Sequence, residues 1–174
     1  MQAVYDLARN IKLLIFDVDG VLTDGSLYLG DDGQEYKAFN SLDGHGMKML
    51  KNSGVELAII TGRTSKVVIH RAHNLGITHL YQGVHDKLQA FHDLTEKLGL
   101  HLEQCAFMGD DVIDLPVMRR CGLAVTVPQA PELVQRHAHH VTRREGGRGA
   151  AREVCELIMQ AQNTLEAQLS IYLK

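Results

Sequence analysis

The chain has 174 residues, of which 45% are hydrophobic and only 3 are prolines, and its formal net charge is −3. This length and composition suit one folded domain with a sizeable core, and they exclude a disordered or low-complexity chain. The acidic balance and the absence of tryptophan argue against a generic nucleic-acid binder, which is more often basic and uses aromatic side chains to stack bases. We therefore predict a single domain over residues 1–174 with no nucleic-acid partner.

The termini and the cysteines give expectations about the compartment. Residues 1–10 include Asp6 and Arg9 but no apolar stretch like that of a secretory signal, and the longest apolar runs, such as Leu13–Phe16, are too short to cross a bilayer. The cysteines are odd in number and far apart, so they are predicted to be reduced and mostly buried. We expect a cytoplasmic protein without a membrane partner.

Short apolar runs of β type alternate with stretches whose apolar residues recur every three or four positions. In chain order, the predicted elements are a strand over Ile11–Phe16, a helix over Gly44–Asn52, a strand over Val55–Ile60, a helix over Ser65–Asn74, a strand over His79–Tyr81, a helix over Asp86–Leu98, a strand over Cys105–Met108, a helix over Val112–Arg120, a strand over Leu123–Val127 and a helix over Glu132–Ala138. The alternation predicts an α/β fold, a Rossmann-like parallel sheet flanked by helices on both faces.

Two segments depart from the alternation. Within residues 25–40, the runs Ser26–Leu29 and Glu35–Phe39 flank an Asp-Asp-Gly turn, a pattern typical of a β-hairpin. A lone hairpin is marginal in water, so this one should pack on the domain or pair with another subunit. The last segment opens with the glycine-rich Gly146–Ala150 and is predicted to continue as one amphipathic helix to about Leu169.

The most informative stretch follows the first predicted strand. Asp17 ends that strand and Asp19 comes two residues later, so both carboxylates are expected on one face. In an open parallel sheet, ligands bind at the carboxyl ends of the strands. Two carboxylates placed together there repel each other unless a cation or a shared proton relieves them. Gly20 permits the sharp turn that follows.

A second acidic cluster, Asp110, Asp111 and Asp114, follows the strand predicted over Cys105–Met108. Acidic residues in the first turn of a helix are also favoured by the helix dipole and by capping, so this cluster alone is open to a structural interpretation. Both clusters lie at one edge of one predicted sheet, and together they offer hard oxygen ligands. Such ligands suit Mg²⁺ rather than zinc.

Two further positions suit a phosphate group. The strand over Val55–Ile60 ends in Thr61-Gly62-Arg63, and a hydroxyl with backbone N–H groups at a strand–helix junction can hold an anion. Lys87 lies at the start of the helix predicted over Asp86–Leu98, and it is either a solvated surface charge or the cation that neutralises phosphate.

In this order, the residues resemble the four motifs of the haloacid dehalogenase superfamily of phosphatases, namely Asp17-Val18-Asp19-Gly20-Val21, Thr61-Gly62, Lys87, and Gly109-Asp110-Asp111 with Asp114. The resemblance implies that Asp17 is the nucleophile that forms an aspartyl-phosphate. It implies that Asp19 is the general acid for the leaving alcohol and then the base for water. Mg²⁺ would be bound by the Asp17 side chain, the Asp19 backbone carbonyl and Asp110. Thr61, Gly62 and Lys87 would hold the phosphoryl oxygens, with Asp111 and Asp114 in support.

Members of this superfamily that act on small substrates usually carry an inserted cap domain. Between Asp17 and Thr61 there is room only for the hairpin, one helix and one strand, and between Thr61 and Lys87 only for one helix and one strand. We therefore predict a capless fold. An open site favours a macromolecular substrate or a lid from another subunit, for which the hairpin is the natural oligomerisation element.

The hairpin, the segment Lys37–Gly46 and the stretch Gly146–Glu153 are similar to those of the 3-deoxy-D-manno-octulosonate 8-phosphate phosphatases. That resemblance implies hydrolysis of an eight-carbon sugar-acid phosphate in lipopolysaccharide biosynthesis. It also implies a homotetramer in which neighbouring subunits complete each site. The C-terminal tail is expected either to reach a neighbouring active site or to be a frayed helix end. It implies a substrate-binding set of Asn40, Ser41, Leu42, Asp43, Gly44, Lys48, Arg63 and Arg71. Lys48 stands where relatives are expected to have an arginine, and a lysine cannot make the planar two-pronged contact of a guanidinium.

Three alternatives stay open at this stage. One is a phosphatase of the same design for a nine-carbon sugar acid phosphate, which the catalytic residues cannot distinguish. Another is a non-catalytic oligomerisation module, although a scaffold would not need Asp17, Asp19, Lys87 and Asp110 together. The last is a protein phosphatase, which suits the open site but not the hairpin.

Overall fold

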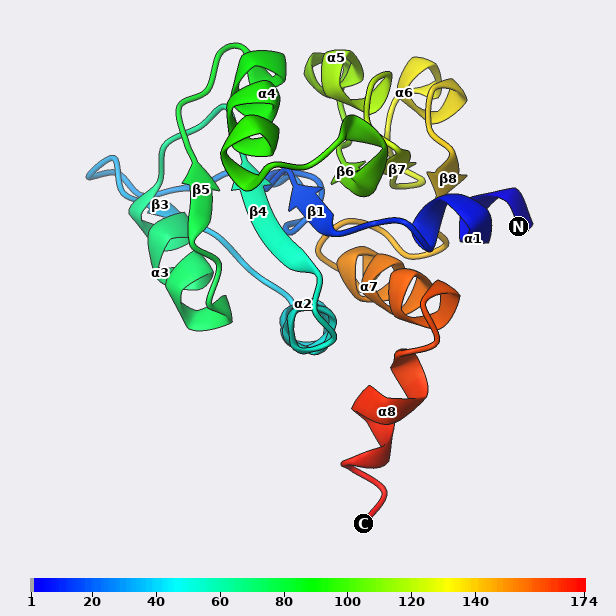
Figure 1. The fold of residues 1–174 in the computed structure, drawn as a ribbon. Coiled ribbons are helices and arrows are strands. Elements are labelled where there is room, and N and C mark those ends of the chain that lie inside the picture. Colours follow the sequence, from blue (N-terminus) through cyan, green and yellow to red (C-terminus); the bar gives the residue numbers. More distant parts are fainter. Residues whose placement is uncertain (1) are drawn as a thin grey trace.

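The computed structural model describes residues 2–174, and its centre is a six-stranded sheet (Figure 1). The strand order is β5-β4-β1-β6-β7-β8, and each neighbouring pair is parallel. The strands are β1 (Leu13–Phe16), β4 (Glu56–Ile60), β5 (His79–Tyr81), β6 (Cys105–Met108), β7 (Leu123–Thr126) and β8 (His140–Val141). This arrangement confirms the predicted parallel α/β sheet, and it adds the short edge strand β8.

Two layers of helices cover the sheet (Figure 1). One layer holds α1 (Gln2–Ala8), α2 (Ser41–Asn52), α3 (Lys66–Leu75) and α7 (Ala150–Ala161), and the other holds α4 (Lys87–Leu98), α5 (Leu115–Met118) and α6 (Glu132–Arg136). Because both faces are covered, all four residues of β1, of β6 and of β7 are buried. This burial explains why those strands are continuously apolar in the sequence instead of alternating.

Two predicted helices are wrong in their extent. The stretch Val112–Arg120 divides into a 3₁₀ turn at Val112–Asp114 and the short α5, because Pro116 fits the first turn of a new helix. A similar 3₁₀ turn, Leu102–Gln104, precedes β6.

The C-terminal helix is also not continuous. It stops at Ala161 and resumes as α8 (Leu165–Ser170), with Asn163 between them in the left-handed region at φ 58°. The Gln162 side chain donates to the carbonyls of Ala8 and Ile11, 3.1 and 2.7 Å away, and this contact with the chain entering β1 holds the break in place.

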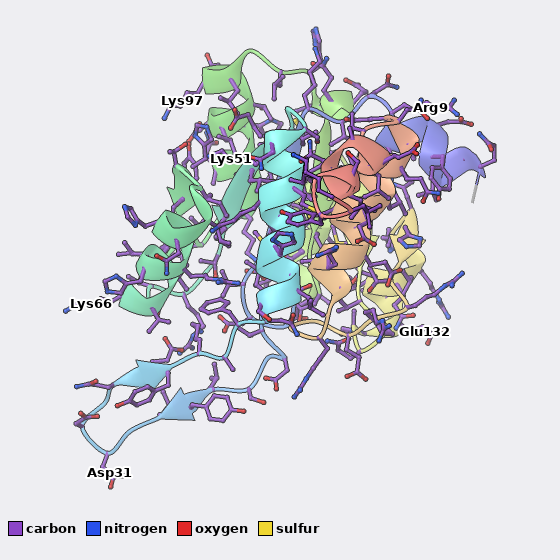
Figure 2. The ribbon with its side chains drawn as sticks, turned by 90° about the horizontal axis from the view of Figure 1, so that it is seen from below. Arg9, Asp31, Lys51, Lys66, Lys97 and Glu132 are labelled. Carbon is purple, nitrogen blue, oxygen red and sulfur yellow. The ribbon has the colours of Figure 1, made fainter. Side chains whose placement is uncertain are left out.

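The hairpin forms as predicted but with shorter strands, β2 (Tyr28–Leu29) and β3 (Glu35–Tyr36), which pair antiparallel. It protrudes from the body of the molecule with Asp31 at its tip (Figure 2). Between Asp17 and Thr61 the chain forms only this hairpin, α2 and β4, as expected for a fold without a cap domain.

Among residues 2–174, no helix is both long and apolar enough to span a membrane.

Candidate active site

The motifs predicted to be catalytic meet at the carboxyl edge of the sheet because the strands that precede them are parallel neighbours. Phe16, the last residue of β1, aligns with Ile59 of β4 on one side and with Met108 of β6 on the other. The residues that follow these strands line a cavity of about 300 Å³. Its lining consists of Asp17, Asp19, Gly25, Leu27, Thr61, Gly62, Arg63, Asp110, Asp111 and Ile113.

Asp17 is held rigidly at the floor of this cavity and is only 5% exposed. Its Oδ1 accepts a hydrogen bond of 2.7 Å from the Val18 N–H, and its Oδ2 lies 2.7 Å from the Lys87 ammonium. Burial, with a further contribution from the charge of Asp114, raises the pKa of Asp17 to about 6, although Lys87 opposes the shift. A carboxylate that is fixed in direction and poorly solvated is well suited to act as a nucleophile.

Lys87 is the buried cation of the site. It is the first residue of α4 and contacts Asp114 Oδ1 at 2.7 Å as well as Asp17. Burial by itself would lower the pKa of Lys87, but the two carboxylates outweigh it and raise that pKa. The other Asp114 oxygen accepts from the N–H groups of Asp110 and Asp111, at 3.0 and 3.2 Å. Asp114 is thus fully engaged, and it ties the loop after β6 to α4.

The Asp110 carboxylate differs from its neighbours, because no hydrogen-bond donor to it occurs among residues 2–174. Burial first, and then the charges of Asp17 and Asp114, raise the pKa of Asp110 to about 7. One oxygen each of Asp17, Asp110 and Asp114 lie within 4.8 Å of one another. Three gathered carboxylates, of which Asp17 and Asp114 are buried and Asp110 is partly exposed, leave excess negative charge beside one ammonium group. Their all-oxygen donor set fits a hard divalent cation such as Mg²⁺.

The packing beneath Asp110 requires a glycine. Gly20 has φ +83°, and a Cβ built there would lie 1.9 Å from Asp110 Oδ2. We expect Gly20→Ala to lower the free energy of unfolding by at least about 1–2 kcal/mol and to raise the Mg²⁺ concentration that gives half-maximal activity. Gly33→Ala is the matched control, since Gly33 has φ +77° but no atom within 4 Å of such a Cβ. Equal changes in the Mg²⁺ requirement of both variants would contradict this packing argument.

The raised pKa values predict how the stability of the metal-free protein depends on pH. Because the pKa values of Asp17 and Asp110 are about 6 and about 7 in the fold, against 3.8 normally, the folded chain holds more protons than the unfolded chain in that interval. The free energy of unfolding should therefore fall as the pH rises from about 5 to about 8 in EDTA. Thermal melts measure this, with Asp110→Asn as the control that flattens the slope. A wild-type slope that is no steeper than that of the control would refute the prediction.

Asp19 shares the cavity but not the acidic cluster. Its Oδ1 accepts from the Lys37 ammonium at 2.5 Å, and its Oδ2 lies 3.9 Å from Arg63 Nε. No chemical role is predicted for Lys37 from the sequence, although its side chain is only 1% exposed. Its place in an alternating run of a hairpin resembles that of an ordinary solvent-facing lysine, so only the three-dimensional structure reveals it. The role expected of the Asp19 backbone carbonyl in metal binding stays a prediction.

The residues predicted to hold phosphate are gathered as expected. Thr61 is buried, and both Thr61 and Gly62 line the cavity. The Thr61 N–H donates to the Tyr81 carbonyl, so the hydroxyl of Thr61 is the group left to contact a phosphoryl oxygen. Asp111 mainly caps the following 3₁₀ turn, accepting from the Val112 N–H at 2.7 Å.

The predicted sugar-binding set is more dispersed, and only Arg63 of it lines the cavity. The Asn40 side chain caps α2, and the Asn40 backbone carbonyl accepts a hydrogen bond from Arg71 Nη2 at 3.0 Å. The buried Asp43 carboxylate accepts from the N–H groups of Gly149 and Arg152 and so caps α7. Exposed members of the set are Ser41, Leu42, Lys48 and Arg63, while Gly44 is buried beneath Arg71. Within one chain, Asn40 to Gly44 and Arg71 lie at the start of α2, while Lys48 lies further along that helix and Arg63 lies at the cavity. The contact of all these residues with substrate stays a prediction.

The matches to known proteins cover nearly the whole chain. The family model for haloacid dehalogenase-like hydrolases matches residues 79–153. The 3-deoxy-D-manno-octulosonate 8-phosphate phosphatase of Yersinia pestis is 55% identical over 163 residues, which cover 94% of this chain and 87% of that protein.

Solved structures agree with these matches. A crystal structure of a Pseudomonas syringae protein superposes with a TM-score of 0.99 at 54% identity, covering 100% of this chain and 99% of the other. The 3-deoxy-D-manno-octulosonate 8-phosphate phosphatase of Moraxella catarrhalis, solved with magnesium ion, phosphate ion and KDO, has a TM-score of 0.97 at 46% identity, with 99% of each chain covered. The chain therefore belongs to the 3-deoxy-D-manno-octulosonate 8-phosphate phosphatase family of the haloacid dehalogenase-like hydrolases.

Proposed function

We propose that this protein is a Mg²⁺-dependent phosphomonoesterase that hydrolyses 3-deoxy-D-manno-octulosonate 8-phosphate to the free sugar acid and phosphate. The observation that carries the proposal is the convergence of Asp17, Lys87, Asp110 and Asp114 at one sheet edge. The identity of 55% with a phosphatase of this name supports the choice of substrate. The product belongs to lipopolysaccharide biosynthesis, and we place the enzyme in the cytoplasm.

The chain's own residues suffice to outline the reaction. Asp17 attacks phosphorus in line with the sugar oxygen, so that a bond from phosphorus to an Asp17 oxygen forms as the bond to the sugar breaks. Asp19 gives a proton to the departing sugar oxygen, and it then takes one from the water that hydrolyses the aspartyl-phosphate. Lys87, Thr61 and Gly62 bind the phosphoryl oxygens and hold them for the attack.

A divalent cation fits between these groups, and Asp17, Asp110 and the Asp19 backbone carbonyl are the residues that would hold it. When bound, Mg²⁺ neutralises charge on the transferring phosphoryl group. Asp114 positions this set through Lys87 and through the backbone N–H groups of Asp110 and Asp111.

A substrate panel tests the proposal. Purified protein is assayed for phosphate release from 3-deoxy-D-manno-octulosonate 8-phosphate, from a nine-carbon sugar acid phosphate and from a phosphopeptide. The proposal predicts the highest kcat/KM for the eight-carbon substrate. A preference for the nine-carbon substrate would assign the enzyme to that sugar acid phosphate instead. No phosphate release from any of the three compounds would favour a non-catalytic oligomerisation module.

Metal removal is the second test. Because Asp17, Asp110 and Asp114 gather beside a single ammonium group, their excess negative charge calls for a cation, so EDTA should stop phosphate release and added Mg²⁺ should restore it. Asp6→Asn, which changes an exposed carboxylate on α1, should respond to EDTA as the wild type does. Turnover that is unaffected by the chelator would contradict the metal assignment.

The hairpin is proposed as the oligomerisation element of a homotetramer. Its apolar side chains are unusually exposed, with Leu29 at 66% and Tyr36 at 58%, although water disfavours such a surface. Packing against other subunits would cover these side chains and bring neighbouring residues to the open cavity. Sedimentation of the wild type and of Leu29→Glu measures this, since the charged variant should shift toward smaller species.

A further inference from the structure

The contact between Lys37 and Asp19 is the least expected feature of the site. Lys37 follows β3 directly, and its ammonium reaches out of the hairpin to Asp19 Oδ1 at 2.5 Å. The same ammonium lies 3.1 Å from Glu35 Oε1. With 1% exposure of its side chain, Lys37 is as inaccessible to solvent as a core residue. A lysine loses hydration and side-chain freedom when it is buried, so a position of this kind calls for an explanation.

The charges around Lys37 form a closed set that is separate from the metal cluster. Arg63 Nη2 donates to Glu35 Oε1 at 3.0 Å, so two cations face the two carboxylates of Glu35 and Asp19. Lys87, by contrast, pairs with Asp17 and Asp114. Lys37 and Lys87 thus hold separate pairs of carboxylates, and the Asp110 carboxylate is paired with neither.

This division gives Asp19 a fixed direction. Lys37 occupies Oδ1, while the nearest cation to Oδ2 is Arg63 at 3.9 Å, beyond hydrogen-bond distance. Of the two Asp19 oxygens, Oδ2 is therefore the one that no hydrogen-bond donor among residues 2–174 occupies, so it is the one open to a bound substrate. Because Asp17 and Asp19 line the same cavity, a phosphate ester attacked by Asp17 would present its leaving oxygen within this space.

We propose that Lys37 is a positioning residue for the leaving-group step, holding Asp19 through Oδ1 so that Oδ2 faces the sugar oxygen. This inference rests on the proposed phosphatase function. In the step it serves, the bond from phosphorus to the sugar oxygen breaks, the bond to Asp17 forms, and the proton on Asp19 Oδ2 moves to the sugar oxygen. The hairpin therefore carries a determinant of catalysis in addition to its exposed surface.

Two substrates with different leaving groups can distinguish a positioning role of Lys37 from a merely structural one. A sugar alcohol is a poor leaving group and needs its proton as the bond breaks, whereas p-nitrophenolate leaves readily without one. Loss of acid catalysis should therefore slow hydrolysis of the sugar phosphate far more than that of p-nitrophenyl phosphate. A variant that only loosens the fold should slow both substrates alike.

The experiment compares Lys37→Met with Lys97→Met on both substrates in the presence of Mg²⁺. Lys97 is an exposed residue near the end of α4, on the side of the molecule opposite the hairpin (Figure 2). We expect Lys37→Met to lose about 10- to 100-fold more kcat/KM on 3-deoxy-D-manno-octulosonate 8-phosphate than on p-nitrophenyl phosphate, and Lys97→Met to lose little on either. In an Asp19→Asn background, Lys37→Met should cost nothing further, because the group it positions is already disabled.

Equal losses on the two substrates, or a further loss in the Asp19→Asn background, would overturn the proposal. Should Lys37→Met fail to fold, Glu35→Gln/Lys37→Met also removes one of the two carboxylate charges that faced the lysine, and it undergoes the same comparison. If that variant is also unfolded, Lys37 is a stability residue and the proposal is wrong. The wild type serves as the reference for the function itself. If it releases no phosphate from either substrate, the proposed function fails, whereas a working wild type with equal variant losses defeats only the role of Lys37.

Discussion

Asp17→Asn is expected to abolish phosphate release from a sugar phosphate while the chain stays folded. An amide at this position keeps the shape of the side chain but cannot attack phosphorus, so kcat/KM should fall by more than about 10⁴-fold. The fold should tolerate the change, because burial already disfavours the charged form of this carboxyl and raises its pKa to about 6. Lys87 also keeps Asp114 as a partner at 2.7 Å.

The measurement pairs a phosphate-release assay with a thermal melt of the same preparation. Asp6→Asn makes the same chemical change on the exposed face of α1 and should retain both activity and melting temperature. A folded Asp17→Asn variant with near-normal turnover would show that another group is the nucleophile.

Lys87→Met should produce the largest combined loss of stability and activity. The methionine fills a similar volume but removes the only ammonium that contacts Asp17 and Asp114 in residues 2–174, leaving them beside Asp110 without compensation. Stripping one partner from a buried ion pair costs about 3–5 kcal/mol of unfolding free energy. Activity should fall by at least about 100-fold, because a preorganised cation near the transferring phosphoryl group is lost.

The pH dependence identifies the cause of this loss. Without Lys87, the charge that lowers the pKa values of Asp17 and Asp110 is gone, so the folded variant takes up protons more readily than the unfolded chain. In EDTA, the unfolding free energy of Lys87→Met should therefore recover more steeply than that of the wild type as the pH is lowered from about 8 to about 5. Urea titrations at several pH values measure this, with Lys97→Met as control. A variant as stable as the wild type at neutral pH would show that the ammonium is not needed to balance the cluster.

The sequence was sufficient to predict the acidic half of the site, for a local physical reason. Asp17 and Thr61 directly follow β1 and β4, and Asp110 follows β6 after one glycine. Parallel neighbouring strands bring their carboxyl ends together. Once the strands are recognised from their apolar runs, the gathering of these groups is a consequence of topology. Lys87 follows the same logic, since it begins the helix that comes after β5.

The hairpin side of the site could not be predicted in the same way. The Lys37–Asp19 pair joins residues separated by a glycine turn and by an irregular loop, where no periodicity fixes how the chain is directed. The position of Asp19 relative to Asp17 illustrates the limit. The prediction that Asp19 shares a face with Asp17 treats both as strand residues, whereas β1 ends at Phe16, and the Asp19 carboxylate is directed to the hairpin.

The break in the C-terminal helix depends on tertiary contacts for a similar reason. The stripe of apolar residues continues through Leu165, so periodicity alone favours one long helix. The side chain of Gln162 instead binds backbone carbonyls at the entrance to β1, and this contact outweighs local helix propensity.

The central claim is that one divalent cation binds where Asp17 and Asp110 converge, at the carboxyl ends of β1 and β6. Anomalous diffraction from crystals grown with Mn²⁺, a hard cation that accepts the same oxygen ligands, tests it directly. The account predicts a single strong peak between those two carboxylates, and its loss in Asp110→Asn. A peak beside Glu35 and Asp19 instead, or no peak near Asp17 in crystals of active enzyme, would contradict it.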